Sequence, residues 1–362
     1  MTIYVATLAV VFMVILIVRL QQQAALTSSQ GRHEIFAGVP RLAVGFIALL
    51  LILVAGLRWR TGTDYVQYAL DYPRYRDQSL SDVGLLGEPG LNVLVRIAAY
   101  VRDDPASMFF TASAVTISLI VWTYYKNSPM FGTSLALYVL VGAWHSSFNG
   151  IRQWLACAVL FAGHRLIVER RLGPYLAVVG VATLFHVSAL VAVGFYFVPR
   201  TRLGLARFLA VGAASVLALT LYEALADAIV IFRDSSTETL LQNAYFQERI
   251  NPLRVALAAG PLVFYLLISK QRTMAVEGHF YLNMVVVHTA IYVAALNSAY
   301  IARFAIFTVV YLPVLIPYLL TMEDRRARAL WAGLLLLVYA VFWVFELRSD
   351  PSVASYKSYW DR

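Results

Sequence analysis

The sequence predicts an all-α, polytopic integral membrane protein with about ten full spans. Of its 362 residues, 60% are hydrophobic and only 14% are charged. Soluble chains carry about 25% charged residues, so this composition excludes a soluble globular or a disordered protein. The single Cys157 excludes a disulfide framework and a cysteine-based metal site. The net charge of +9 is interpreted through membrane topology, and no nucleic-acid partner is expected.

Basic residues at alternate connectors give the expected orientation. Arg19, Arg32 and Arg41 follow the first apolar run, so the positive-inside rule places this connector in the cytoplasm and both termini outside. We expect a single transmembrane domain over residues 1–362, with external loops at about 58–104 and 222–251. The runs expected to cross fully are Thr2–Leu20, Leu42–Leu57, Ala106–Tyr125, Phe131–Phe148, Ile151–Val168, Phe208–Leu221, Pro252–Ile268, Phe280–Leu296, Ile301–Leu320 and Leu330–Phe345.

Two apolar segments do not fit a full crossing. Residues 89–101 are too few to span the bilayer, which suits a re-entrant or interfacial helix. Residues 173–199 have basic clusters at both ends but are too few for two crossings. We therefore expect a hairpin of two half-helices that meet near Phe185 and His186.

The first two polar clusters lie in the first external loop. In the run from Arg58 to Tyr65, Asp64 stands near Arg58 and Arg60, and ionisable groups at a membrane boundary are often functional. The alternative for this cluster is an interfacial anchor. Glu88 precedes a proline-initiated helix, and its alternative role is to favour that helix N-terminus by its negative charge.

Three further clusters are expected near the same membrane face. Arg152 lies in a short turn between Asn149 and Gln153, where its guanidinium suits a phosphate; the alternative is a helix cap. His186 and Ser188 lie at the expected helix break, and the alternative is a hydrogen-bonded core histidine. Arg303 follows Tyr300 at the start of a span, where snorkelling to the interface is the alternative.

Together these clusters predict one external site with arginines and two carboxylates. Arg152, Arg303, Arg58 or Arg60 would bind a diphosphate, and Asp64 or Glu88 would act as a base. The sequence has no Ser-His-Asp spacing, metal motif, Walker motif or dinucleotide glycine pattern.

These motifs, in this order, resemble the EpsG family within the Wzy-like group of bacterial polysaccharide polymerases. The similarity covers residues of about 40 to 320. The matching residues are Gly62-Thr63-Asp64-Tyr65 with Tyr68, Glu88-Pro89-Gly90, Asn149 with Arg152-Gln153 and Leu155-Ala156, Phe185-His186 with Ser188-Ala189, and Tyr300 with Arg303.

The resemblance implies an enzyme with a GT-C-like fold. It would join polyprenyl-diphosphate-linked oligosaccharide repeat units, donor and acceptor, at the outer face of the bacterial inner membrane. Asp64, or second Glu88, would be the base; Arg152 and Arg303, helped by His186, would stabilise the leaving diphosphate. Supporting residues would be Asn149, Gln153, Tyr65, Tyr68, Ser188 and Tyr300. The product would be exopolysaccharide, capsule or O-antigen.

The reaction needs no nucleotide cofactor, because the lipid diphosphate is already activated. A hard cation shared by Asp64, Glu88 and substrate oxygens stays open. Besides substrate and membrane lipid, chain-length regulator and flippase proteins are expected partners.

Two other functions stay open at the level of sequence. The first is an O-antigen-ligase-like or polyprenyl-phosphate-sugar transferase, which would use the same site. The second is a flippase or exporter of lipid-linked oligosaccharides, which would need polar residues along several spans. The middles of the predicted spans are almost entirely apolar, which favours an enzyme.

Overall fold

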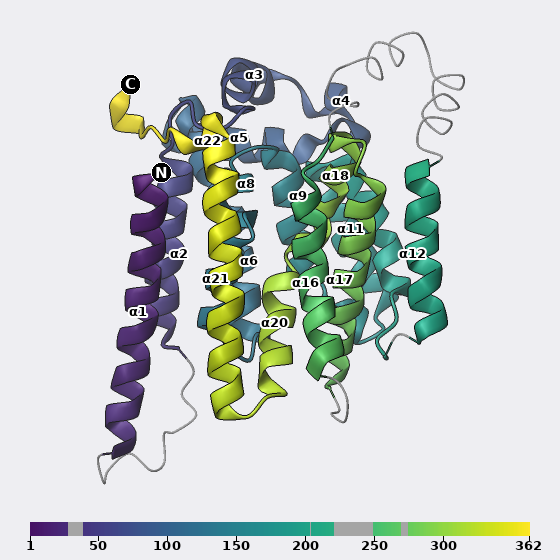
Figure 1. Ribbon diagram of the computed structural model, residues 1–362. Helices are drawn as coiled ribbons and strands as arrows, with labels where there is room; N and C mark the ends of the chain where they lie inside the picture. Colours follow the sequence, from purple (N-terminus) through teal and green to yellow (C-terminus); the bar gives the residue numbers. More distant parts are fainter. Residues whose placement is uncertain (28–38, 203, 221–248, 269–273) are drawn as a thin grey trace.

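A computed structural model describes residues 1–27, 39–202, 204–220, 249–268 and 274–362, and this part of the chain is all-helical (Figure 1). Most of the predicted external loop at 222–251 lies outside the described residues. The longer helices are α1 (Thr2–Thr27), α2 (Arg41–Gly56), α3 (Tyr65–Asp77), α5 (Pro89–Val101), α6 (Pro105–Asn127), α7 (Phe131–Leu140), α9 (Ile151–Ala162), α11 (Leu172–Phe185), α12 (Leu205–Thr220), α16 (Pro252–Ile268), α17 (Val276–Ala294), α20 (Leu312–Thr321) and α21 (Arg325–Ser349).

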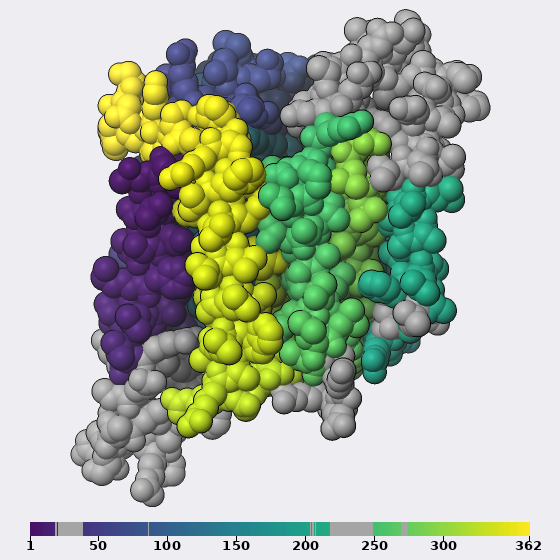
Figure 2. Space-filling model, viewed as in Figure 1, coloured from purple at the N-terminus to yellow at the C-terminus, as the bar shows by residue number. Residues whose placement is uncertain are grey.

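Short helical segments connect these helices. They are α4 (Leu80–Val83), α8 (Ala143–Ser146), α10 (Arg165–Val168), α18 (Ala299–Ala302), α19 (Ile306–Val309) and α22 (Pro351–Ala354), with the 3₁₀ segments η1 (Leu85–Gly87), η2 (Val187–Phe197), η4 (Arg303–Ala305) and η5 (Tyr359–Asp361). Helices α3, α4, α5, α18 and α22 lie at the end of the bundle where both termini are found (Figure 1). In the space-filling view, α21 forms a ridge between α1 and α16 on one face (Figure 2).

The expected count of about ten full spans stays a prediction. Among the described residues, α6 and α21 are long and apolar enough to cross a membrane, and residues 299–321 form a third candidate that is bent by 48°. The shorter apolar helices of the described chain have 10–17 residues. Backbone breaks divide the predicted runs at 131–148, 151–168 and 301–320, whereas α2 and α16 cover their predicted runs without a break. One such break separates α7 from α8 at Gly142, whose φ of 83° suits glycine.

The predicted hairpin at 173–199 is confirmed, including its break. Helix α11 ends at Phe185, His186 is extended with φ −157° and ψ 122°, and η2 follows. The two arms are antiparallel, since the Tyr175 hydroxyl donates to the Ala192 carbonyl at 2.7 Å. The two arms have the same length although they differ in residue number. A 3₁₀ helix rises about 2.0 Å per residue and an α-helix about 1.5 Å, so the 11 residues of η2 extend as far as the 14 residues of α11.

The predicted short helix at 89–101 is also present, as α5, and it belongs to a small core beneath this end of the bundle. The core joins α3, α5, α6 and α9, and its largest members are Tyr65, Tyr68, Tyr72, Tyr75, Met108 and Phe109. The four tyrosines recur every three or four residues along α3, so they lie on one helix face and bury it. This core holds the helix starts that carry Asp64, Glu88 and Arg152.

The C-terminal segment crosses the loop between α2 and α3. The Trp59 N–H donates to the Lys357 carbonyl at 2.8 Å, and the Gly62 N–H donates to the Ser352 carbonyl at 3.0 Å. These contacts hold the backbone that leads directly to Asp64.

Candidate active site

The candidate site is centred on Glu88, which accepts hydrogen bonds from three donors. The Arg152 guanidinium lies 2.5 Å from Oε2, while His186 Nδ1 and the Val187 N–H lie 2.5 and 2.9 Å from Oε1. The Glu88 side chain is only 8% exposed. We call Glu88, Arg152 and His186 the Glu88 cluster.

Glu88 has an unusual backbone for a non-glycine residue. Its φ of 64° and ψ of 54° are in the left-handed region, and its side chain makes no hydrogen bond to the start of α5. Such conformations cost on the order of 1 kcal/mol or more and are found where surrounding contacts fix them. The carboxylate is therefore turned away from its own helix and toward Arg152 and His186.

The charge of Glu88 is stabilised by its neighbours. Burial acts to raise the pKa of this carboxyl, but the bonds from His186 and the Val187 N–H, with the Arg152 charge, outweigh it and lower the pKa. Glu88 is therefore ionised at neutral pH. Its contribution to stability is present above its unfolded pKa and is lost as the pH falls through the lower folded value.

Asp64 lies against the same helix start as Arg152. Its Oδ2 accepts from the Gly150 N–H at 2.8 Å and its Oδ1 from the Thr63 hydroxyl at 3.1 Å. Since Gly150 and Arg152 are two residues apart, the N-terminus of α9 brings both predicted carboxylates to one place. Asp64 is partly exposed, unlike Glu88.

Two glycines allow these close approaches. Gly62 has φ +100°, and a Cβ there would lie 2.4 Å from Asn149 Oδ1. A Cβ on Gly90 would lie 2.8 Å from the Leu184 carbonyl and 2.9 Å from the Phe185 ring. Gly90 thus lets the start of α5 reach the end of α11, where Glu88 meets His186.

Arg152 and His186 keep surface for a ligand. Their side chains are 34% and 25% exposed. Within the described chain, Arg152 uses Nη1 for Glu88 and Nε for the Tyr68 hydroxyl at 3.4 Å, and neither its Nη2 nor His186 Nε2 has a hydrogen bond. His186 is therefore not a core histidine.

The supporting residues separate into two groups. The Gln153 amide donates to the Arg303 carbonyl at 2.9 Å, so the segment of Arg303 and Tyr300 lies next to α9, with both side chains exposed. The hydroxyl oxygens of Ser188 and Tyr65 are buried, and neither has a hydrogen-bond partner among the residues that the structure describes. Tyr65 packs in the core, its ring stacked 4.2 Å from that of Phe109.

Arg58 and Arg60 do not join the Glu88 cluster. Arg58 is 1% exposed, lies between the rings of Phe109 and Phe148, and donates to the Ala55 and Phe148 carbonyls. It fastens α2 to the turn before α9 and offers no surface to a diphosphate. Arg60 is exposed and lies over the Trp59 ring, 5.8 Å from its centre, as an interfacial anchor would.

Sequence reasoning missed the backbone donors of Gly150 and Val187, because main-chain N–H groups have no sequence signature. The glycines of the Gly62-Thr63-Asp64 and Glu88-Pro89-Gly90 motifs were the available signal for close backbone contact. In the part of the chain that the structure describes, no group of three or more His, Cys, Asp or Glu side chains is arranged to hold a metal ion.

The fold and site define a class: an all-helical protein with several apolar helices, as in a membrane protein, and a carboxylate–arginine–histidine cluster at one end of the bundle. The sequence matches the EpsG family over residues 41–359, and the chain belongs to this family. Membership suggests a polysaccharide polymerase. Comparisons with curated proteins and with solved structures found no match.

We expect Gly90→Ala to damage the site through packing alone. The added Cβ would press on the Leu184 carbonyl, and overpacking of this kind costs about 1–3 kcal/mol. Moving α5 away from α11 would also pull Glu88 from His186. The measurement is thermal unfolding together with polymer yield; Gly180→Ala in α11 is the matched control, because nothing lies within 4 Å of its added Cβ. Equal behaviour of the two variants would contradict this role of Gly90.

Proposed function

We propose that the protein is a GT-C-like glycosyltransferase that polymerises polyprenyl-diphosphate-linked oligosaccharide repeat units at the outer face of the bacterial inner membrane. The observation that carries this proposal is the convergence of Asp64 and the Glu88 cluster at the start of α9. A partly exposed carboxylate there lies near an arginine and a histidine that can bind an anion. General base and anion stabiliser are the two functions that this reaction needs.

Asp64 is the better candidate for the base. Glu88 accepts from three donors and has a lowered pKa, so its oxygens are occupied and it is a weak proton acceptor. Asp64 accepts two bonds and is partly exposed, so it can receive a further proton donor. In our proposal Glu88 positions Arg152 and His186 and does not take the substrate proton.

The proposed step is a displacement at the anomeric carbon of the donor chain. The acceptor hydroxyl oxygen forms the new glycosidic bond and gives its proton to Asp64, while the bond from the anomeric carbon to the diphosphate oxygen breaks. The electron pair leaves with the polyprenyl diphosphate, near Arg152 Nη2 and His186 Nε2. A carboxylate on Nδ1 orients an imidazole and stabilises its charged form, as Glu88 would do here. Arg303 is the second proposed diphosphate ligand.

Reconstitution tests the proposed function. Lipid-linked repeat units extracted from a strain that lacks this protein are mixed with the purified protein, with and without a chelator. A ladder of products separated by one repeat supports a polymerase, and loss of the ladder with chelator would show a need for a cation. Transfer of sugar to another acceptor would instead identify a ligase or sugar transferase. Movement of intact lipid-linked units across vesicles without new glycosidic bonds would identify a carrier.

A further inference from the structure

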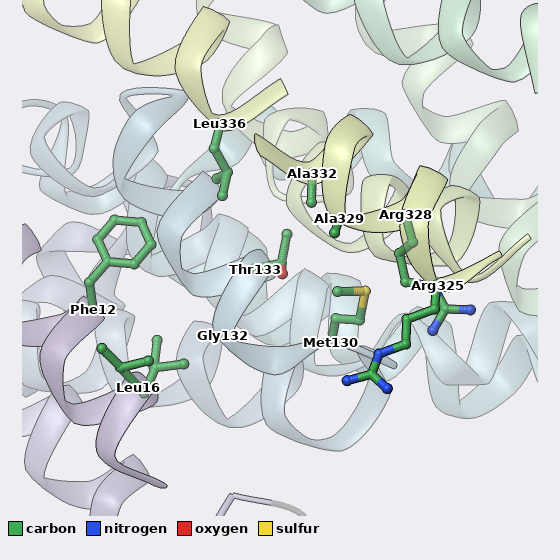
Figure 3. Close-up of a pocket in the computed structure, with 11 residues that line it drawn as sticks. Phe12, Leu16, Met130, Gly132, Thr133, Arg325, Arg328, Ala329, Ala332 and Leu336 are labelled. Atoms are coloured by element: carbon green, nitrogen blue, oxygen red, sulfur yellow. The ribbon is translucent and has the colours of Figure 1, made fainter. Parts of the chain in front are cut away.

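A cavity of ≈ 390 Å³ lies between α1, α7 and α21 (Figure 3). It is separate from the candidate site. Its walls are mainly apolar, with Phe12 and Leu16 on α1 facing Ala332 and Leu336 on α21. Arg325 and Arg328 lie at one end of it, near Met130 (Figure 3). We call this cavity the α1–α21 groove.

The groove exists because α1 packs closely on α7 but not on α21. A Cβ on Gly132 of α7 would lie 2.7 Å from the Ile15 side chain, so these two helices touch. On α21 the residues that face the groove include Ala329 and Ala332, whose small side chains leave space. Phe12 and Leu16 are 39% and 55% exposed. The groove therefore has apolar walls that the described chain does not cover.

The two arginines at the end of the groove differ in their hydrogen bonds within the protein. Arg328 donates to the carbonyls of Leu320 and Glu323 at 3.1 and 2.9 Å, so it holds the end of α20. Arg325 is exposed and makes no hydrogen bond or ion pair with the rest of the described chain. The Asp324 carboxylate accepts from the N–H groups of the first turn of α21. A guanidinium at the end of an apolar groove suits an anionic group with an attached hydrocarbon chain.

The length of the groove fits one leaflet of a bilayer. From Arg325 to Leu336 α21 rises about 16 Å, close to half of a hydrocarbon core about 30 Å thick. The candidate site lies near the other end of α21, about 37 Å away along a helix of 25 residues. A diphosphate bound at the candidate site would thus be far from Arg325, so the anion here belongs to a different molecule.

We propose that the α1–α21 groove binds an anionic phospholipid of the leaflet opposite the candidate site. Its phosphate pairs with Arg325, and one acyl chain lies along Ala329, Ala332 and Leu336 against Phe12 and Leu16. The lipid would fill the gap between α1 and α21. This proposal does not depend on the proposed function.

Lipid titration of the full-length protein in detergent tests the proposal. The probes are phosphatidylglycerol, phosphatidylcholine and inorganic phosphate, with binding followed by native mass spectrometry and by the rise in Tm. We expect phosphatidylglycerol to bind more tightly than phosphatidylcholine. Arg325→Gln should weaken phosphatidylglycerol about fivefold, which is the loss expected for one basic residue at a membrane surface. Arg326→Gln is the matched control, since Arg326 is an exposed arginine of the same turn that does not line the groove.

A second variant tests the apolar part of the groove. Ala332→Phe should fill the groove and weaken binding of both lipids, while the lipid-free protein stays monodisperse with an unchanged Tm. If Arg325→Gln and Arg326→Gln bind phosphatidylglycerol equally, or if inorganic phosphate raises the Tm as much as the lipid does, the proposal is wrong.

Discussion

Asp64→Asn should reduce polymerisation by about 10²–10⁴-fold, the usual contribution of a positioned general base. The substitution keeps the shape of the side chain. Because an Asn side-chain oxygen can still accept from the Gly150 N–H, the contact of α3 with α9 should survive. What is lost is the ability to take a proton from the acceptor hydroxyl.

Two measurements separate this chemical effect from misfolding. Polymer amount and chain length are compared in cells that carry the variant, and the purified variant is assayed for ladder formation at matched protein level and Tm. Asp82→Asn is the control, because Asp82 is an exposed carboxylate of the same polar segment. Polymer of normal amount and length in D64N would remove Asp64 from the mechanism.

The fold could be predicted for those segments whose flanking charges and length are compatible with only one arrangement. Basic clusters on both sides of residues 173–199 required a hairpin, and the observed break at His186 agrees with that prediction. Helix α5 begins at Pro89, as its proline predicts. The division of other apolar runs was not predicted, because a break such as the one at Gly142 depends on a backbone conformation that composition does not reveal.

The sequence was enough to predict which residues make up most of the candidate site, but not which role each of them has. The sequence pattern selected Asp64, Glu88, Arg152 and His186, and the structure brings these residues together. The sequence pattern could not distinguish Arg58 from Arg60, two residues further on. Arg58 is buried against Phe109 and Phe148, whereas Arg60 is exposed. Burial of an arginine depends on carbonyls and rings from distant segments, and these have no local signature.

The difference between the two carboxylates also required the structure. From sequence, Asp64 and Glu88 are both acids near arginines. The distinction depends on how many donors each accepts, and one of the donors to Glu88 is the main-chain N–H of Val187, 99 residues away. The number of donors therefore supports the order of candidates that the family resemblance implies, with Asp64 first, and it is the basis for the proposed positioning role of Glu88.

Arg152→Ala should lower the rate of polymerisation by about 10²–10³-fold, the usual loss for one donor that stabilises developing charge. Two effects overlap in this variant. The substitution removes the proposed partner of the leaving diphosphate, and it also leaves the buried Glu88 carboxylate without its arginine, a loss that can cost several kcal/mol of stability. Arg74→Ala, at an arginine that is 59% exposed, is the control.

The double variant Arg152→Ala with Glu88→Gln separates these effects. If Arg152 served only to neutralise Glu88, removal of both charges would restore stability, and the double variant would be as active as Glu88→Gln alone, which already lacks the carboxylate on His186. We expect stability to return while activity stays low, because the double variant still lacks a guanidinium for the diphosphate. Arg152→Lys keeps a charge but not the planar fork that can reach Glu88 and a phosphate at once, so it should retain intermediate activity. The loss should appear in kcat more than in KM, since the diphosphate gains its additional negative charge only as its bond to the anomeric carbon breaks. Polymerisation in the double variant equal to that of Glu88→Gln alone would assign Arg152 to the fold alone.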